Sequence, residues 1–358
     1  MTNTRRKFIK SIGLASVVAA TGLPSPKAYA KKIKWKMVTS WPKNFPGLGS
    51  GAETLASYIN QLSGGSLTVK VFGANELVPP LGVFDYVSSG GAEMGHSGAY
   101  YWKGKTAAAQ FFSSVPFGMT AQEMNAWLYY GGGLELWEKV YSKFNLVPRA
   151  AGNTGVQMGG WFNKEISTAD DLKGLKMRIP GLGGDVLSRA GGTPFTLAGA
   201  EIFTSLQTGV IDATEWVGPY NDRAFGLHKA AKYYYYPGWH EPGPSLECII
   251  NKDAYLGLTK EHKAIIDLAC KAANIDMISD YMSKNYQALE FFKKEKIKIK
   301  QFPREVLLKL KKISEDVLLD LSSTDAISKE VYESYNNFLK RVRPWTILSE
   351  DSYLSSIK

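Results

Sequence analysis

Cysteine is scarce in this chain, with only Cys248 and Cys270 among 358 residues. Neither lies in a Cys-x-x-Cys pair or in a mixed cysteine and histidine spacing, so the sequence offers no zinc site of the usual kinds. A disulfide between them would suit an oxidising compartment, but the sequence favours two small apolar side chains buried in the core.

Motifs of catalysis and nucleotide binding are absent as well. No Gly-x-Ser-x-Gly elbow occurs, and the four histidines lack a spacing such as His-Glu-x-x-His, which favours structural roles for them. Five residues separate Gly98 from Gly104 where a phosphate loop requires four, and the glycine-rich segment 181–184 after Pro180 is typical of a tight turn. Neither nucleotide binding nor triad catalysis is therefore predicted. The histidines are His96, His228, His240 and His262.

Long hydrophobic runs are limited to the leader. Thr4 to Lys10 is basic and contains paired arginines, Ile12 to Leu23 is apolar, and Ala28-Tyr29-Ala30 is a small-residue cleavage site. This order predicts a twin-arginine-type signal peptide over residues 1–30, so that the mature chain begins at Lys31. We therefore expect export to the periplasm and, without a later run of about 18 apolar residues, a soluble mature protein.

Basic residues exceed acidic ones, with a formal net charge of +10, but five of the basic residues lie in the leader. Cleavage lowers the net charge to +5. The remaining lysines are spread over the C-terminal part without an aromatic-interleaved basic stripe, so we exclude nucleic acid as a partner.

Strand and helix patterns alternate through Ala254. Residues 34–40 and 67–72 have strand patterns, and residues 52–62 have the apolar spacing of a helix. After an extended segment over 146–162 the alternation repeats, which predicts a boundary near Ala150 and an α/β fold with central sheets covered by helices. The later expected elements are a strand over 175–179, a helix over 185–190 and a helix over 202–209 that ends at a glycine.

Beyond Thr259 the sequence is typical of long amphipathic helices. Apolar residues recur there at intervals of three or four positions, which defines a stripe along one helix. The stripe either packs on its own domain or contacts a partner helix, and the sequence leaves both open. The stripe consists of Ile275, Ile278, Met282, Tyr286, Leu289 and Phe292.

Glu215 is an acidic residue in an otherwise apolar segment. Glu215 and Trp216 occur within residues 210–219, which are otherwise apolar enough to be buried, and a buried carboxylate requires a partner. The available partners are Arg178, at the end of an expected strand, and a cation held by oxygen ligands. Glu241 is a second candidate carboxylate. A structural ion pair between Arg178 and Glu215 and a ligand-binding role are equally compatible with these residues.

Two stretches decide between these alternatives by resemblance. Asp171-Leu-Lys-Gly-Leu-Lys-Met-Arg178 and Leu206-Gln-Thr-Gly-Val-Ile-Asp212 resemble the signatures of DctP-like periplasmic solute-binding proteins of tripartite ATP-independent periplasmic (TRAP) transporters. The Glu215-Trp216 pair and residues 233–243 further resemble the subgroup that binds 2-oxo or 2-hydroxy monocarboxylates with a metal ion. The resemblance extends from about Trp35 to the C-terminal helices.

The resemblance implies a two-lobed periplasmic binding protein fold with a ligand cleft between the lobes and long C-terminal helices. We expect lobe I over residues 31–150, lobe II over 151–245, and a return to lobe I followed by dimerisation helices over 246–358. It also implies a homodimer and TRAP membrane subunits as partners.

The resemblance assigns Arg178 to the ligand carboxylate, which suits the forked guanidinium. It assigns the metal to Gln157, Glu215, the backbone carbonyl of Trp216, and Glu241. Because all four ligands offer oxygen, sodium or calcium is expected rather than zinc or copper. A 2-oxo acid would chelate the ion through one carboxylate oxygen and the keto oxygen.

Three further residues are expected at the ligand. Tyr100 and Tyr101 match the aromatic region that faces the cleft in this family, although core packing remains open for each. Asn153 precedes Gln157 by four residues, and we expect both on the same face of one strand, with the Asn153 amide donating to the ligand.

The expected function is therefore solute binding by lobe closure, without catalysis. The ligand would be pyruvate, a longer 2-oxo acid or lactate. Two alternatives remain at this point. One is a periplasmic hydrolase that uses Glu215 and Glu241 as an acid and base pair, and the other is a sensory ligand-binding component that binds the same acids.

Overall fold

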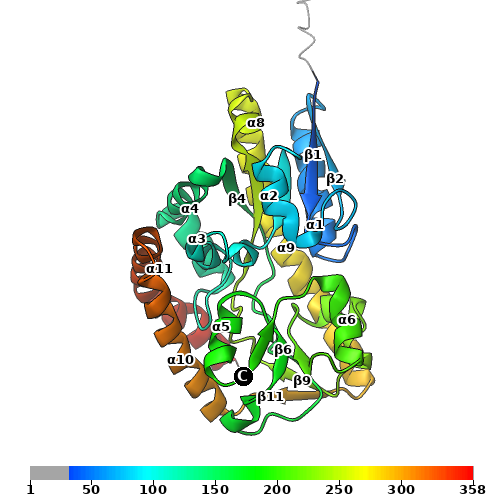
Figure 1. Cartoon of the computed structure of the whole chain (residues 1–358), viewed down its shortest axis with the longest axis vertical. Helices are drawn as coiled ribbons and strands as arrows, with labels where there is room; N and C mark the ends of the chain where they lie inside the picture. Colours follow the sequence, from blue (N-terminus) through cyan, green and yellow to red (C-terminus); the bar gives the residue numbers. More distant parts are fainter. Residues whose placement is uncertain (1–31, 358) are drawn as a thin grey trace, which may run out of the picture.

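The structure is a computed structural model that describes residues 32–357, so the expected signal peptide and its cleavage site lie outside the described residues. It consists of two halves, each built around one β-sheet (Figure 1). We call the half with the five-stranded sheet the first lobe and the half with the six-stranded sheet the second lobe. This is the mixed α/β, two-lobed fold that the sequence predicts.

The first lobe has the strand order β2-β1-β3-β10-β4. The first three strands are parallel to one another, whereas β10 runs antiparallel to both of its neighbours. Helices α1, Leu48–Leu62, and α2, Val83–Ser88, pack on this sheet. The strands are β1, Ile33–Thr39; β2, Leu67–Phe72; β3, Met94–Ser97; β4, Leu146–Asn153; and β10, Ser245–Asn251.

The second lobe has the strand order β11-β9-β5-β8-β6-β7. Three of its strands, β6, β7 and β8, are each followed by a helix: α5, Gly181–Arg189; α6, Gly199–Gln207; and α7, Pro219–Ala224. The strands are β5, Gly160–Phe162; β6, Lys176–Arg178; β7, Thr193–Phe195; β8, Ala213–Thr214; β9, Tyr233–Tyr236; and β11, Lys298–Gln301.

Among residues 32–357, three segments connect the two sheets. Residues 154–159 lead from β4 to β5, residues 237–244 lead from β9 back to β10, and helix α9, Lys260–Lys294, runs from the first lobe to β11 in the second. Helix α9 contacts β4 and α1 in one lobe and α7 in the other. The segment expected to return to lobe I therefore also supplies a strand, β11, to the second sheet.

The C-terminal helices lie against both lobes, as Figure 1 shows in orange and red. Helix α10, Arg304–Ser322, packs on α5, and α11, Ala326–Thr346, packs on α3, Ala121–Tyr130, and α4, Gly133–Tyr141. A π-helical turn, Ile347–Asp351, and α12, Ser352–Ser356, follow. The remaining helix is α8, Lys252–Leu256, and the 3-10 turns are Pro80–Gly82, Ala99–Trp102, Ala107–Phe112, Ser142–Phe144, Ala169–Leu172 and Leu227–Lys229. No helix among residues 32–357 is long and apolar enough to cross a membrane.

Helix α5 begins at Gly181, four residues before the expected start, so the expectation of a glycine turn over 181–184 is wrong. The glycines are explained by close packing. A Cβ atom at Gly184 would lie 2.6 Å from the carbonyl oxygen of Ile179, and one at Gly183 would lie 3.0 Å from the Cβ of His240. Small residues thus allow α5 to approach both β6 and the segment that carries His240.

The expected apolar stripe on α9 is divided between two environments. Ile275, Met282 and Tyr286 are exposed, whereas Phe292 is fully buried and packs edge-to-face on Trp161. Apolar spacing identifies one face of a helix, but it does not fix which neighbour each position along that face meets. Phe292 therefore belongs to the core of the second lobe.

Both cysteines are free and buried, as the sequence analysis favoured. Cys248 lies on β10 and Cys270 on α9, and both belong to the same apolar cluster in the first lobe. The hydrogen bond with Cys270 and the burial of the side chain raise the pKa of the Cys248 thiol well above its usual value. Such a thiol is unreactive at neutral pH.

Candidate functional site

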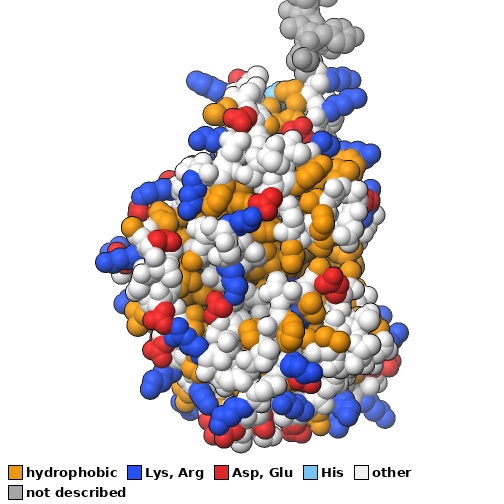
Figure 2. All heavy atoms as spheres, in the orientation of Figure 1, with side chains coloured by type: hydrophobic (Ala, Val, Ile, Leu, Met, Phe, Trp, Pro, Cys, Tyr) orange, Lys and Arg blue, Asp and Glu red, His pale blue; other side chains and the backbone are white. Residues whose placement is uncertain are grey.

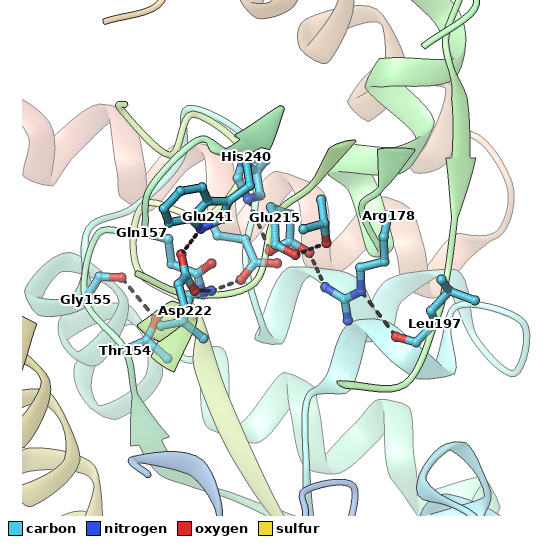
Figure 3. Close-up of polar contacts among 12 residues, drawn as sticks. Thr154, Gly155, Gln157, Arg178, Leu197, Glu215, Asp222, His240 and Glu241 are labelled. Carbon is cyan, nitrogen blue, oxygen red and sulfur yellow. Dashed lines mark hydrogen bonds and ion pairs between the residues drawn. The ribbon is translucent and has the colours of Figure 1, made fainter. Parts of the chain in front are cut away.

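The candidate site lies at the junction of the two lobes, where several chain segments end. Arg178 is the last residue of β6, and Glu215 and Trp216 follow β8 directly. Gln157 and Glu241 lie in the two loops that connect the lobes. Figure 3 shows Gln157, Glu215, His240 and Glu241 pointing toward one another, with Arg178 beside Glu215.

The junction opens to the surface on one side. Figure 2 shows hydrophobic side chains gathered at mid-height of the molecule, where the lobes meet, while charged side chains are spread over the outer regions. A cavity of about 240 Å³ lies between the lobes on the side of α6. It is lined by Ser40, Pro42, Ala74, Asn75, Pro79, Pro80 and Leu81 of the first lobe and by residues 198–201 of the second.

Arg178 is buried, with its side chain 1% exposed. Its Nη1 donates to Glu215, its Nε donates to the carbonyl oxygen of Leu197 at 3.2 Å, and its Nη2 donates to the Tyr101 hydroxyl at 3.2 Å. The guanidinium also lies 5.0 Å from the centre of a Trp216 ring. Burial lowers the pKa of Arg178, but the charge of Glu215 outweighs this effect, so the pKa lies above its usual value and the side chain remains charged.

Two buried carboxylates lie together in this site. Glu215, Glu241 and the neighbouring His240 each offer one ligand atom, and these atoms all lie within 4.8 Å of one another. Burial, and then the negative charge of Glu215, raises the pKa of Glu241 well above its usual value. The ionised form of Glu241 is therefore disfavoured beside Glu215, and a positive ion between the two side chains would relieve this repulsion.

Unpaired acceptors point to the kind of ion that fits. Gln157 donates through its Nε2 to Glu241 at 2.8 Å, but its Oε1 is buried without a hydrogen-bond partner in the described part of the chain, and so is Oε2 of Glu215. Buried polar atoms are nearly always paired, so these two orphaned oxygens, one from an amide and one from a carboxylate, lie beside the Glu241 carboxylate as donors suited to a positive ion. These oxygen donors fit a hard cation such as sodium or calcium.

The two tyrosines approach the same site from the first lobe. Tyr100 and Tyr101 lie in the 3-10 turn Ala99–Trp102 that follows β3, and their rings are 4.6 Å apart. Tyr101 contacts Arg178 across the junction through its hydroxyl. Burial raises the pKa of both hydroxyl groups, so both remain protonated donors at neutral pH. The Trp102 indole in turn donates to the buried Glu247, which fixes this turn on the first lobe.

The expectation that Asn153 and Gln157 share one strand face is wrong. Strand β4 ends at Asn153, and Gly155, with a φ of 72°, turns the chain out of the sheet before Gln157. The Asn153 amide donates to the Gly243 carbonyl at 3.1 Å and accepts from the Gly155 backbone at 2.8 Å. Asn153 thus joins the two interlobe loops, and its role toward a ligand stays a prediction.

Sequence reasoning missed two residues of this region. His240 is buried beside Glu215 and Glu241, and its adjacency to Glu241 was the only signal for it. Asp222, on α7, is fully buried and accepts hydrogen bonds from the Trp161 indole at 2.9 Å and the Tyr234 hydroxyl at 2.7 Å. Burial raises the pKa of Asp222 to about 7.

Comparison with known proteins identifies the family. Residues 37–324 match the model of the DctP family, described as bacterial extracellular solute-binding protein, family 7. The chain belongs to this family. It is therefore a periplasmic transport protein and not an enzyme, which removes the hydrolase alternative.

The chain is similar to several characterised proteins over nearly its whole length. It is 44% identical over 355 residues to a monocarboxylate 2-oxoacid-binding periplasmic protein of Nostoc sp., covering 98% of this chain and 97% of that protein. A TRAP periplasmic solute-binding protein from Colwellia psychrerythraea, solved with calcium and pyruvate, is 43% identical with a TM-score of 0.89. One from Pseudoalteromonas atlantica, solved with sodium and pyruvate, is 42% identical with the same TM-score. The alignments cover 91% and 92% of this chain and 100% of each solved chain.

Proposed function

We propose that this protein captures a 2-oxo monocarboxylate of the size of pyruvate, together with a calcium or sodium ion, and delivers it to the membrane subunits of a TRAP transporter. The observation that carries this proposal is the pairing of a buried arginine with unpaired buried oxygens at the junction of two lobes. The names of the related proteins support the same ligand class.

Charge balance gives each group its proposed role. Glu215, Glu241 and the incoming carboxylate carry up to three negative charges, whereas Arg178 supplies one positive charge. A buried excess of anions is costly, so the closed complex requires a cation. In this proposal Arg178 releases part of its contact with Leu197 or Tyr101 and presents two donors to the ligand carboxylate.

The cation is held by oxygen from four residues in this proposal: Gln157, Glu215, the backbone carbonyl of Trp216, and Glu241. The orphaned Oε1 of Gln157 and Oε2 of Glu215 support it. One ligand carboxylate oxygen and the 2-oxo oxygen complete the coordination, so the ion selects for an oxygen at the 2-position. Calcium has the higher charge, and therefore offsets two ionised glutamates better than sodium does.

Tyr100, Tyr101 and Asn153 complete the proposed ligand site. The Tyr101 hydroxyl already contacts Arg178, which supports its position beside the ligand carboxylate. Tyr100 is 9% exposed and packs against Tyr101, so it is suited to wall off the methyl end of a small acid. An apolar wall discriminates by only about 1–3 kcal/mol per methylene, so longer 2-oxo acids remain weaker candidate ligands. Lactate remains a candidate because its 2-hydroxyl also offers an oxygen to the ion.

Calorimetric titration with pyruvate and propionate tests the function. Propionate has the same carboxylate and nearly the same size but lacks the 2-oxo oxygen. With calcium present, pyruvate should bind at least about tenfold more tightly, equivalent to about 1.4 kcal/mol. Equal affinity for the two acids would contradict the chelate, and binding of neither would contradict the function.

We further propose that the protein is a homodimer. The C-terminal segment exposes several large apolar side chains, which a monomer would leave in water. The exposed face of α9 adds further apolar surface. The exposed residues are Trp345, Ile347, Leu348, Tyr353, Leu354 and Ile357 in the C-terminal segment and Ile275, Met282 and Tyr286 on α9.

Export by the twin-arginine route remains part of the proposal, supported by Arg5 and Arg6 in the leader. Fusing residues 1–30 to a reporter that is exported only when folded tests this route, and replacing both arginines with lysine should abolish export. A sensory role differs only in the partner, so pull-down with TRAP membrane subunits separates transport from signalling.

A further inference from the structure

His240 is the one member of the buried cluster that the proposed function leaves unused. Its side chain is 1% exposed, and neither ring nitrogen has a hydrogen-bond partner among residues 32–357. Burying an imidazole without partners is costly, since at least one nitrogen always carries a proton and the other offers a lone pair. The Cβ of His240 lies against α5 at Gly183, where an added Cβ would come within 3.0 Å of it.

The distance from His240 to Glu215 suits two ligands of one ion. Nε2 of His240 lies 3.4 Å from Oε2 of Glu215, and the Glu215 oxygen has no other partner. Two neighbouring ligand atoms at about 2.0–2.2 Å from an ion, about 90–110° apart, are separated by roughly 2.8–3.6 Å. The ligand atoms of Glu215, His240 and Glu241 lie within 4.8 Å of one another, which is short enough for one ion to reach all three.

We propose that His240 converts the oxygen site into a mixed nitrogen and oxygen site that also binds divalent transition metals of the zinc class. This rests on the proposed function, because it concerns the cation of the same site. Imidazole suits zinc, cobalt and nickel, whereas calcium takes oxygen ligands almost alone. For a given set of nitrogen and oxygen ligands, affinity rises along the series from manganese to copper.

The two cations would share only part of the ligand set. Calcium uses the oxygens of Gln157, Glu215, Trp216 and Glu241, while a zinc-class ion moves toward Nε2 of His240 and needs fewer ligands. A 2-oxo acid chelates either kind of ion. The metal supply of the periplasm therefore decides which complex forms, and a zinc-class ion competes with calcium for the protein.

A matched set of variants tests this inference with cobalt as the probe. The untagged, metal-free protein is titrated with Co²⁺ while its visible absorption is recorded, and Ca²⁺ affinity is measured by calorimetry in parallel. His240→Gln replaces a nitrogen ligand with an amide that offers an oxygen and has an N–H that can donate to Glu215. His262→Gln removes an imidazole outside the site, where the ring contacts Ser66, and serves as the control.

We expect wild type and His262→Gln to bind Co²⁺ with the same affinity and spectrum. In His240→Gln, the Co²⁺ affinity should fall at least about tenfold and the spectrum should shift, because a nitrogen ligand is lost. The Ca²⁺ affinity should change less than about threefold. An equal loss for both ions would overturn the inference, since it would mean that His240 only positions Glu215, and unchanged Co²⁺ binding would overturn it as well.

A measurement on the wild type keeps the test valid if His240→Gln does not fold. Proton NMR of the Co²⁺-loaded protein should show one strongly shifted, exchangeable imidazole resonance, and its absence would overturn the inference. Failure of the proposed function is distinguishable. If the proposed function fails, wild-type protein does not bind pyruvate in the presence of calcium. If this inference fails, pyruvate binding is intact and only the dependence of Co²⁺ affinity on His240 is absent.

Discussion

Replacing Arg178 with lysine separates its charge from its fork of donors. The guanidinium contacts Glu215, Leu197 and Tyr101 at once, and a lysine ammonium can keep the ion pair with Glu215 but not all three contacts. Two lost hydrogen bonds of about 0.5–1.5 kcal/mol each lower the free energy of unfolding by about 1–3 kcal/mol. Urea denaturation of the metal-free protein measures this loss.

Ligand binding should suffer more than stability. The forked contact with the ligand carboxylate is charge-assisted, and losing one such hydrogen bond costs about 1.5–3 kcal/mol, or a factor of roughly 10 to 150 in Kd. Calorimetric titration with pyruvate in calcium measures it. Arg189→Lys is the matched control, because Arg189 is 43% exposed and pairs with Asp320 on the surface. A Kd for Arg178→Lys within about threefold of wild type would refute the role assigned to Arg178.

Three further predictions concern the carboxylates and the C-terminus. Glu241→Gln should weaken calcium binding at least about tenfold and stabilise the metal-free protein, because burial and Glu215 disfavour ionised Glu241 there; calorimetry and urea denaturation that show neither change would contradict it. Burial raises the pKa of Glu247 to about 7, so on raising the pH the folded state keeps this proton to a higher pH than the unfolded state does. The free energy of unfolding should therefore fall by about 3 kcal/mol as pH rises from about 4.5 to about 7. Denaturation at pH 5 and pH 8 should show a smaller fall in Glu247→Gln, and an unchanged fall would exclude Glu247 as its source. The double variant Leu348→Glu and Tyr353→Glu should be monomeric by light scattering, and a wild type that is already monomeric at micromolar concentration would contradict the dimer.

The local pattern was sufficient for the start of the fold. Residues 34–40, 52–62 and 67–72 match β1, α1 and β2 to within a few residues, because strand alternation and helical spacing are properties of neighbouring side chains. The expected helix over 202–209 likewise corresponds to α6. These elements required no knowledge of distant partners.

Helix α5 and the loop before Gln157 could not be predicted in this way. The glycines of α5 disfavour a helix locally. The close approach of His240 and Ile179 explains Gly183 and Gly184, and a positive φ of 61° explains Gly181. Asn153 and Gln157 look like one strand face in the sequence, but Gly155 at positive φ breaks the strand between them. Tertiary packing overrides the local preference in the first case, and one residue at positive φ does so in the second.

The site was predictable only in part, because some of its residues stand out in the local sequence and others do not. Glu215 stood out because an acid in an apolar segment requires a partner, and the structure pairs it with Arg178. His240 did not stand out, because an isolated histidine is compatible with many environments and its neighbours in the fold come from α5 and the segment after β8. A residue whose role depends on neighbours from distant segments can be identified only from the folded structure.

The dependence of pyruvate binding on the cation tests the central claim most directly. Metal-free protein, prepared by exhaustive chelation in a buffer that contains only a large organic cation, is titrated with pyruvate before and after calcium or sodium is added back. The proposed site requires the ion to offset Glu215, Glu241 and the ligand carboxylate, so pyruvate should bind at least about tenfold more weakly without it, equivalent to about 1.4 kcal/mol. Equal affinity in the metal-free and the metal-loaded protein would contradict the proposal that the cation and the 2-oxo acid bind as one unit.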